Sequence, residues 1–104
     1  MAIQANPQVQ NGVLITGNGV RNVYDVTANT VVKTTSGRVA KVSVLVAGSA
    51  AGGVFDTTTT TSAAITNQVA VIPNAVGVYV IDIPCFNGIV VEPGTGQTVM
   101  VSYI

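Results

Sequence analysis

The residues that could carry out acid, base or metal chemistry are few in this chain. None of the 104 residues is histidine, which removes the commonest general base, the commonest metal ligand and any Ser-His-Asp or Cys-His arrangement. The single cysteine, Cys85, has no cationic neighbour in sequence that would lower its thiol pKa, and its apolar neighbours favour a packed side chain. We therefore expect no catalytic site, no cofactor and no enzymatic activity.

The carboxylates offer little more chemistry. A glycosidase needs two carboxyl groups about 5–10 Å apart. The sequence does not exclude such a pair among its four carboxylates, Asp25, Asp56, Asp82 and Glu92. Sugar sites also use aromatic platforms, however, and the chain has no tryptophan. Without an Asp-x-Asp pattern we expect no calcium loop and no metal site. We expect Asp25 and Asp82 to satisfy turns or strand ladders, and Asp56 to cap the backbone of the threonine run after it.

Two glycine-rich segments superficially resemble phosphate-binding loops. Neither Gly17-Asn18-Gly19 nor Gly94-Thr95-Gly96 completes a Gly-x-Gly-x-x-Gly pattern or opens a helix. Both are therefore predicted to be hairpin turns.

Charge is scarce and balanced. Four basic and four acidic residues make up 8% of the chain, and the formal net charge is zero. The four cations are too few and too spread to follow a phosphate backbone, so we expect no nucleic-acid partner. No basic amphipathic helix, spanning segment or signal peptide is visible, so we expect no membrane role and synthesis in a cytoplasm. A surface this neutral suits a protein covered by partners, although a Thr/Ser-coated monomer remains the alternative.

The elements that must position these residues are strands. β-Branched residues favour strands, and the chain contains 21 valines and 13 threonines. Turn signals separate short extended segments, and no window has a helical period, except that a helical turn over 61–65 stays open. Within 38–47, the residues Val42, Val44 and Val46 are predicted to share one face. Residues 48–53 are predicted to form a loop, and Pro84 is predicted to end a strand that begins at residue 77. The predicted strands cover 13–16, 20–27, 31–35, 38–47, 54–56, 69–72, 77–83, 89–92 and 98–104.

This rhythm predicts an all-β fold, a small β-sandwich or jelly-roll-like barrel of about eight short antiparallel strands. We expect residues 13–104 to form the single domain and residues 1–12 to form an extended N-terminal arm. Pro7 restricts itself and Asn6 to extended conformations, and the isolated apolar residues Ile3 and Val9 suggest that the arm is held by its own sheet or by a neighbour's. The last strand is apolar on both faces, as in a core or an interface. The threonine run is predicted to be either a solvated loop or edge strand with its hydroxyls outward, or an adaptable contact surface. The candidate partner-binding residues are therefore Ile3, Pro7, Val9, Thr57, Thr58, Thr59, Met100 and Ile104.

Residues 36–104 resemble the small β-sandwich structural proteins of tailed bacteriophage particles. The segments that carry the resemblance are AGSAAGG at 47–53, VFD at 54–56, GVYVI at 77–81, NGIVV at 87–91, GTGQ at 94–97 and VSY at 101–103. The resemblance implies a capsid decoration (cement) protein or a related head or tail accessory protein. Such proteins form trimers or dimers, bind the outside of a head where capsid subunits meet, and use an N-terminal arm to reach a neighbour. The departure from the resemblance is size, since we expect no extra domain or fibre segment in these 104 residues.

The resulting hypothesis is a virion protein that binds the major capsid protein or another virion protein, forms a homo-oligomer and stabilises the shell. The alternative is a carbohydrate- or host-binding β-sandwich module of a phage tail or fibre. A small enzyme is the third reading, and the absence of histidine argues against it.

Overall fold

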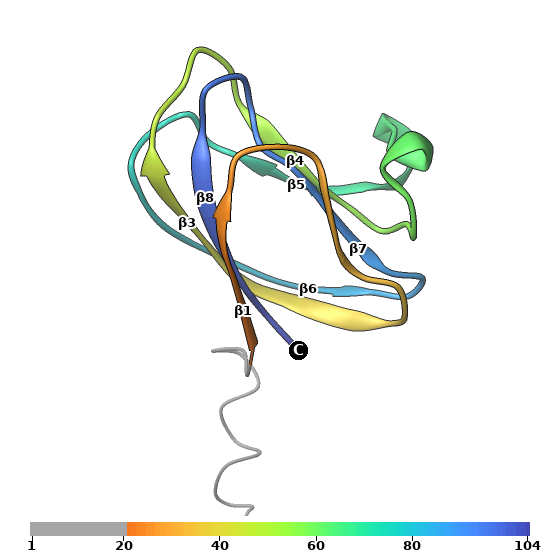
Figure 1. Ribbon diagram of the computed structural model, residues 1–104. Coiled ribbons are helices and arrows are strands. Elements are labelled where there is room, and N and C mark those ends of the chain that lie inside the picture. The colour runs from red at the N-terminus through yellow and green to blue at the C-terminus, as the bar shows by residue number, and fades with distance from the viewer. Residues whose placement is uncertain (1–20) are drawn as a thin grey trace, which may run out of the picture.

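Residues 21–104 are described by the computed structural model, and they form two four-stranded antiparallel sheets (Figure 1). One sheet contains β1 (Arg21–Val26), β3 (Gly37–Val46), β6 (Gly77–Cys85) and β8 (Thr98–Tyr103). The other contains β2 (Thr30–Lys33), β4 (Gly52–Phe55), β5 (Gln68–Ile72) and β7 (Ile89–Glu92). Two 3₁₀-helices, η2 (Thr60–Ser62) and η3 (Ile65–Asn67), join β4 to β5. The all-β prediction is confirmed, whereas the predicted arm over 1–12 and strand over 13–16 lie outside the described residues.

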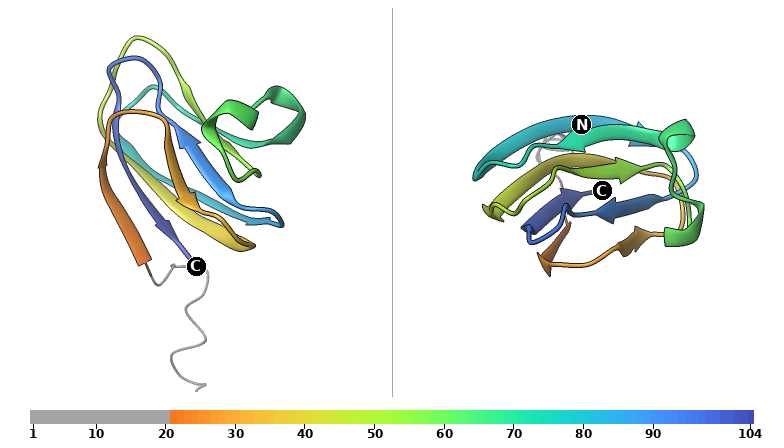
Figure 2. Two further views of the ribbon diagram at one scale, coloured as in Figure 1. Left: turned by 45° about the vertical axis from the view of Figure 1, so that its right-hand side comes forward. Right: turned by 90° about the horizontal axis from the view of Figure 1, so that it is seen from above.

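The strand order identifies the topology. The sheets have the orders β1-β8-β3-β6 and β2-β7-β4-β5. Strand β1 pairs with β8, β2 with β7, β3 with β6 and β4 with β5, as in one long hairpin folded over on itself. Seen from above, the hairpin is rolled into two layers (Figure 2). This arrangement is a jelly roll, which decides between the two all-β architectures that the sequence left open.

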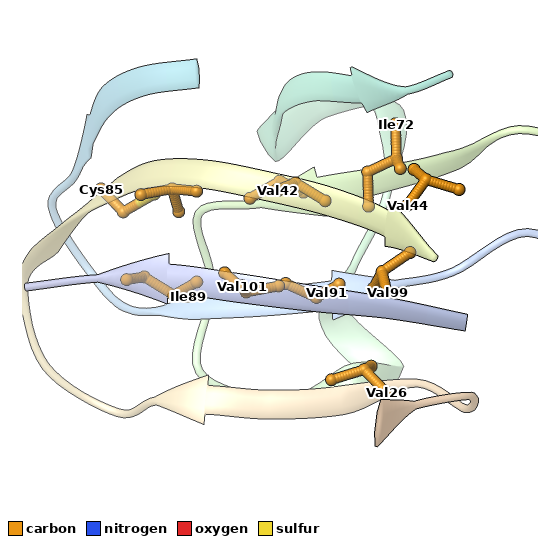
Figure 3. Close-up of a cluster of buried hydrophobic side chains, with 11 residues drawn as sticks. Val26, Val42, Val44, Ile72, Cys85, Ile89, Val91, Val99 and Val101 are labelled. Atoms are coloured by element: carbon orange, nitrogen blue, oxygen red, sulfur yellow. The ribbon is translucent and has the colours of Figure 1, made fainter. Parts of the chain in front are cut away.

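Valine alternation builds the core between the layers. Val42 and Val44 of β3 point inward with Val99 and Val101 of β8, and none of the four is more than 1% exposed. Figure 3 shows them facing side chains of the second sheet, including Val91. Burying each such side chain contributes roughly 1.5–3 kcal/mol.

A bulge at the end of β3 changes the predicted facing of Val46. Val44 pairs with Val99, but Val46 pairs with Thr98, so Leu45 is an extra residue in β3. An inserted residue reverses the alternation beyond it. Val46 therefore lies outside with Leu45, and the prediction that it shares the inward face of Val42 and Val44 is wrong.

The glycine segment at 94–96 is a connection between the sheets, because β7 and β8 lie in different layers. The hairpin prediction is therefore wrong there, and Gly17-Asn18-Gly19 lies outside the described residues. Strands β7 and β8 share no hairpin hydrogen bonds across this connection, and the Gln97 side chain, which is 1% exposed, holds it instead. It accepts a hydrogen bond from the Gly94 N–H at 2.8 Å and donates one to the Pro73 carbonyl at 2.9 Å. Gln97 thereby joins the β7–β8 connection to the β5–β6 connection.

Two strand boundaries differ from the sequence prediction. Strand β6 continues through Pro84 to Cys85, which is possible because it is an edge strand, where a residue without an N–H can be tolerated. Strand β4 begins at Gly52, inside the predicted loop. A Cβ on Gly53 would lie 3.0 Å from the Phe55 ring, so the bare backbone of Gly53 makes room for that ring on the outside of the sheet.

Candidate functional site

The threonine run is mainly an internally bonded connection. Thr57 is buried, whereas Thr58 and Thr59 are exposed. The Thr59 hydroxyl accepts a hydrogen bond from the Ser62 N–H at 3.2 Å and so caps η2. The helical turn left open over 61–65 exists as two short 3₁₀-helices at slightly different positions. Of the three predicted contact residues here, Thr58 and Thr59 alone present surface to a partner.

Met100 and Ile104 lie in different surroundings. Met100 is half-buried on the outside of the first sheet, opposite Ser43. Ile104 exchanges backbone hydrogen bonds with Arg38, and its carbonyl accepts one from the Lys33 ammonium at 3.1 Å. The structure therefore does not gather the predicted partner-binding residues into one site. Ile3, Pro7 and Val9 lie outside the described residues.

An apolar surface lies on part of the outside of the first sheet, next to Lys41, which pairs with Val80. Ser43 of β3 is flanked by Val78 of β6 on one side and by Met100 of β8 on the other. Val80 lies two residues along β6 from Val78, and the bulge places two further apolar residues at the adjoining end of β3. We call this set the outer patch, and its members are Leu45, Val46, Val78, Val80 and Met100.

The outer patch was only partly visible in the sequence. The alternation within 77–83 places Val78 and Val80 on one face and Tyr79 and Ile81 on the other, as the structure has it. Both faces of this segment are apolar. The same feature in the last strand was the reason for naming Met100 as a candidate partner-binding residue. Had it been applied to residues 77–83, Val78 and Val80 would have been candidates too. The bulge that exposes Leu45 and Val46 has no local signal, because it is a mismatch between two strands.

A second feature, an open polar hollow of about 340 Å³, lies on the outside of the other sheet. The Phe55 ring and Gly53 contribute to its floor, and Glu92 and Gln68 contribute a carboxylate and an amide. Phe55 is only 8% exposed, so it offers an edge rather than an open platform. The hollow therefore presents polar groups on an open surface rather than in an enclosed cavity.

The Asp56 carboxylate accepts hydrogen bonds from three consecutive backbone N–H groups and has a structural role. The donors are the N–H groups of Phe86 at 2.9 Å, Asn87 at 2.8 Å and Gly88 at 3.3 Å. Burial works to raise the pKa of Asp56, but these bonds and one from the Asn87 side chain hold it below its ordinary value. The prediction that Asp56 caps the threonine run is wrong, because the carboxylate fastens the β6–β7 corner instead.

Cys85 lies beside this carboxylate. Burial, and secondarily the negative charge of Asp56, raise the pKa of the thiol to about 11. At neutral pH the sulfur is therefore a protonated, 1% exposed core group, which agrees with its predicted packing role.

The other two predicted structural aspartates lie within strands. Asp25 in β1 and Asp82 in β6 have φ values of 53° and 52°, a left-handed conformation that aspartate tolerates better than most residues. Each lies where the pairing register shifts. The Asp82 carboxylate also accepts a hydrogen bond from Arg38 at 3.0 Å.

Among residues 21–104, no three metal-ligating side chains of histidine, cysteine, aspartate or glutamate come together. Within the same range, no helix has the length and apolarity needed to cross a membrane. The outer patch and the polar hollow are the two surface features in this range on which several side chains of one kind gather. Comparison with protein-family models, with curated proteins and with solved structures gives no match to this chain.

Proposed function

We propose that the protein is a structural virion protein that decorates a bacteriophage head and stabilises its shell. The observation that carries this proposal is the outer patch, a set of apolar side chains left on the outside of a small jelly roll. An apolar surface of this kind favours contact with other protein. The jelly-roll architecture is used by viral capsid proteins, although it also serves lectins and enzymes and does not decide function alone.

The composition supports the same proposal. With 8% charged residues and no net charge, little charge must be desolvated when a partner covers the surface. The apolar residues of the arm, Ile3 and Val9, with Pro7 between them, would extend the contact to a neighbouring subunit. Contacts that exist only in the assembled shell stabilise the shell by mass action.

Decoration is tested on heads of the phage that encodes the chain, purified from a mutant that lacks its gene. Adding the purified protein should raise the temperature at which these heads release their DNA, and the protein should sediment with them. L45D and V46D, which place charge in the outer patch, should weaken this binding, and I3D with V9D in the full chain should weaken it further. V31K, on the outside of the second sheet, is the matched control and should bind normally. Failure of the wild-type protein to sediment with the heads would refute the proposal.

The polar hollow favours a second candidate, a carbohydrate-binding module of a tail or fibre. Glu92 and Gln68 provide an acceptor and an amide at a hollow of about 340 Å³, which is large enough for a monosaccharide unit. A glycan array with the wild-type protein and E92Q separates the candidates. Binding to defined glycans that E92Q abolishes would favour the carbohydrate module, and an array without binding would remove it.

A further inference from the structure

Strand β6 has an outer edge whose two halves differ. Within residues 21–104 it is an outermost strand of its sheet and pairs with β3 alone. Natural proteins block such edges with bulges, prolines and charges. All three occur in the second half of β6. The left-handed Asp82 lies at the bulge, and its carbonyl and carboxylate each accept a hydrogen bond from Arg38 at 3.0 Å. Pro84 lies two residues further along. Residues 77–81 contain no proline and no charge.

The other edge strands are shorter or better blocked. Strand β1 carries Arg21 and the left-handed Asp25, and β2 has four residues that end with Lys33. Strand β5 also offers five residues without charge or proline, but Val71 is its one strongly exposed apolar side chain. The first half of β6 carries two, Val78 and Val80, and is therefore the uncharged edge segment with the most exposed apolar side chains in the described part of the chain.

We propose that two copies of this chain associate by antiparallel pairing of their β6 strands over residues 77–81. The two-fold axis lies at Tyr79, so that Val78 of one copy faces Val80 of the second copy. The result is a continuous eight-stranded sheet with both outer patches on one face. This inference deepens the proposed function, on whose homo-oligomer it rests, by naming the surface through which copies meet.

The distribution of charge selects this register. Centring the pair on Val80 would place Asp82 opposite Val78 and set a charge against an apolar neighbour. Centring it on Val78 would require Val76, which precedes the strand. With the axis at Tyr79, every paired position is uncharged, and both Asp82–Arg38 pairs stay outside the contact.

The exposed side chains provide enough area for a weak dimer. Val78 is 66% and Val80 69% exposed, and Val76, at 68%, adjoins them. Val78 and Val80 contact each other across the pair along their sides, and their outward ends stay in the outer patches. The contact therefore buries less than about 1,200 Å² over both copies, which is the size of weak and transient interfaces. We therefore expect a dissociation constant in the micromolar range.

The test is sedimentation velocity of the full 104-residue chain between 5 and 500 µM, concentrations chosen on either side of the micromolar range expected for an interface of roughly this size. The wild-type protein should change from monomer to dimer over this range. V78K places a charge against Val80 of the second copy and should weaken association about tenfold or more. V80E places one against Val78 but also beside Lys41 of its own β3, so it should weaken association by a smaller factor. The double variant V78K/V80E brings the new lysine of each copy opposite the new glutamate of the other and should recover association. V71K, at an exposed position of β5 in the other sheet, is the matched control and should leave association unchanged.

A monomer at 500 µM, or a double variant weaker than both single variants, would overturn the proposed pairing. Circular dichroism of each variant establishes that it is folded. Hydrogen exchange provides a measurement on the unaltered protein, because amides of residues 77–81 should become protected as the concentration rises. A monomer that still binds heads would refute this inference and leave decoration standing, whereas a dimer that binds no heads would do the reverse.

Discussion

Replacing Asp56 tests the reasoning about the β6–β7 corner most directly. Its carboxylate holds three consecutive backbone N–H groups through its two oxygens, Oδ1 for Asn87 and Gly88 and Oδ2 for Phe86. In D56N one oxygen remains, and the new amide group presents hydrogen atoms to the Phe86 N–H. A hydrogen bond to a charged group contributes about 1.5–3 kcal/mol, and water can replace the partner of the exposed Phe86 N–H, so D56N should cost about 1–2 kcal/mol. D56A removes both acceptors and should cost about 3 kcal/mol.

The pH dependence of this loss has a defined sign. The pKa of Asp56 is lower in the folded protein than its ordinary value, so the carboxylate stabilises the fold above the unfolded pKa of about 3.9. That contribution disappears as the pH falls through the folded pKa. The stability difference between wild type and D56N should therefore be complete at pH 7, begin to decrease below about pH 4 and continue to decrease as the pH falls through the lower folded pKa.

Urea denaturation at a series of pH values measures the effect. The matched control is D25N, which makes the same chemical change at an exposed residue whose left-handed backbone asparagine also tolerates. D25N should stay within about 0.5 kcal/mol of wild type. Equal stability of D56N and wild type at pH 7, or a difference that persists unchanged at pH 2.5, would refute the proposed role of the carboxylate.

Three further predictions concern Cys85, Gln97 and Gly48. Because the Cys85 thiol is buried and its pKa is raised to about 11, a disulfide reagent at pH 8 should label it only as fast as the protein unfolds; labelling at the rate of a free thiol without urea would contradict this. Q97A leaves the Gly94 N–H and the Pro73 carbonyl without their partner and should lower the free energy of unfolding by about 2–4 kcal/mol in urea, whereas a loss under 1 kcal/mol would show that water replaces the side chain. G48A places a Cβ 1.9 Å from the Thr95 carbonyl oxygen and should cost about 3 kcal/mol or more, while S49A beside it should change stability by less than about 0.5 kcal/mol; similar melting temperatures for the two variants would refute the steric argument.

The strands could be predicted from the sequence because their signals are local. Valine alternation and the turn residues around Asn74 and Gly88 located most strands to within a few residues. The class of fold followed from the number and spacing of the strands, whereas the jelly-roll order depends on pairings between distant segments. The hairpin predicted at 94–96 was wrong for this reason. Glycines allow a tight turn both in a hairpin and in a connection between two sheets, and the sequence does not show which sheet the next strand joins.

The surface features were harder to predict, because they depend on partners far apart in the chain. Asp56 bonds to residues about thirty positions away, and adjacent threonines offered a local cap that the chain does not use. Strand β6 passes through Pro84 because an edge strand tolerates the missing N–H, and edge position is a property of the sheet. The outer patch likewise depends on the mismatch of β3 and β8 at Leu45, which neither strand reveals alone.

The nested pairing of strands has a consequence for how the chain folds. Strands β4 and β5 are neighbours in sequence, whereas β1 and β8 join the two ends of the described chain. The entropy lost on closing a loop grows with its length, so the inner pair should form early and the outer pair late. Strand β8 also lies between β1 and β3, and during synthesis it emerges after both. Until β8 leaves the ribosome, β1 and β3 have no strand between them, so the first sheet can be completed only after translation has passed residue 103. The final pairing should then take milliseconds to seconds, the folding time of domains with many non-local β contacts.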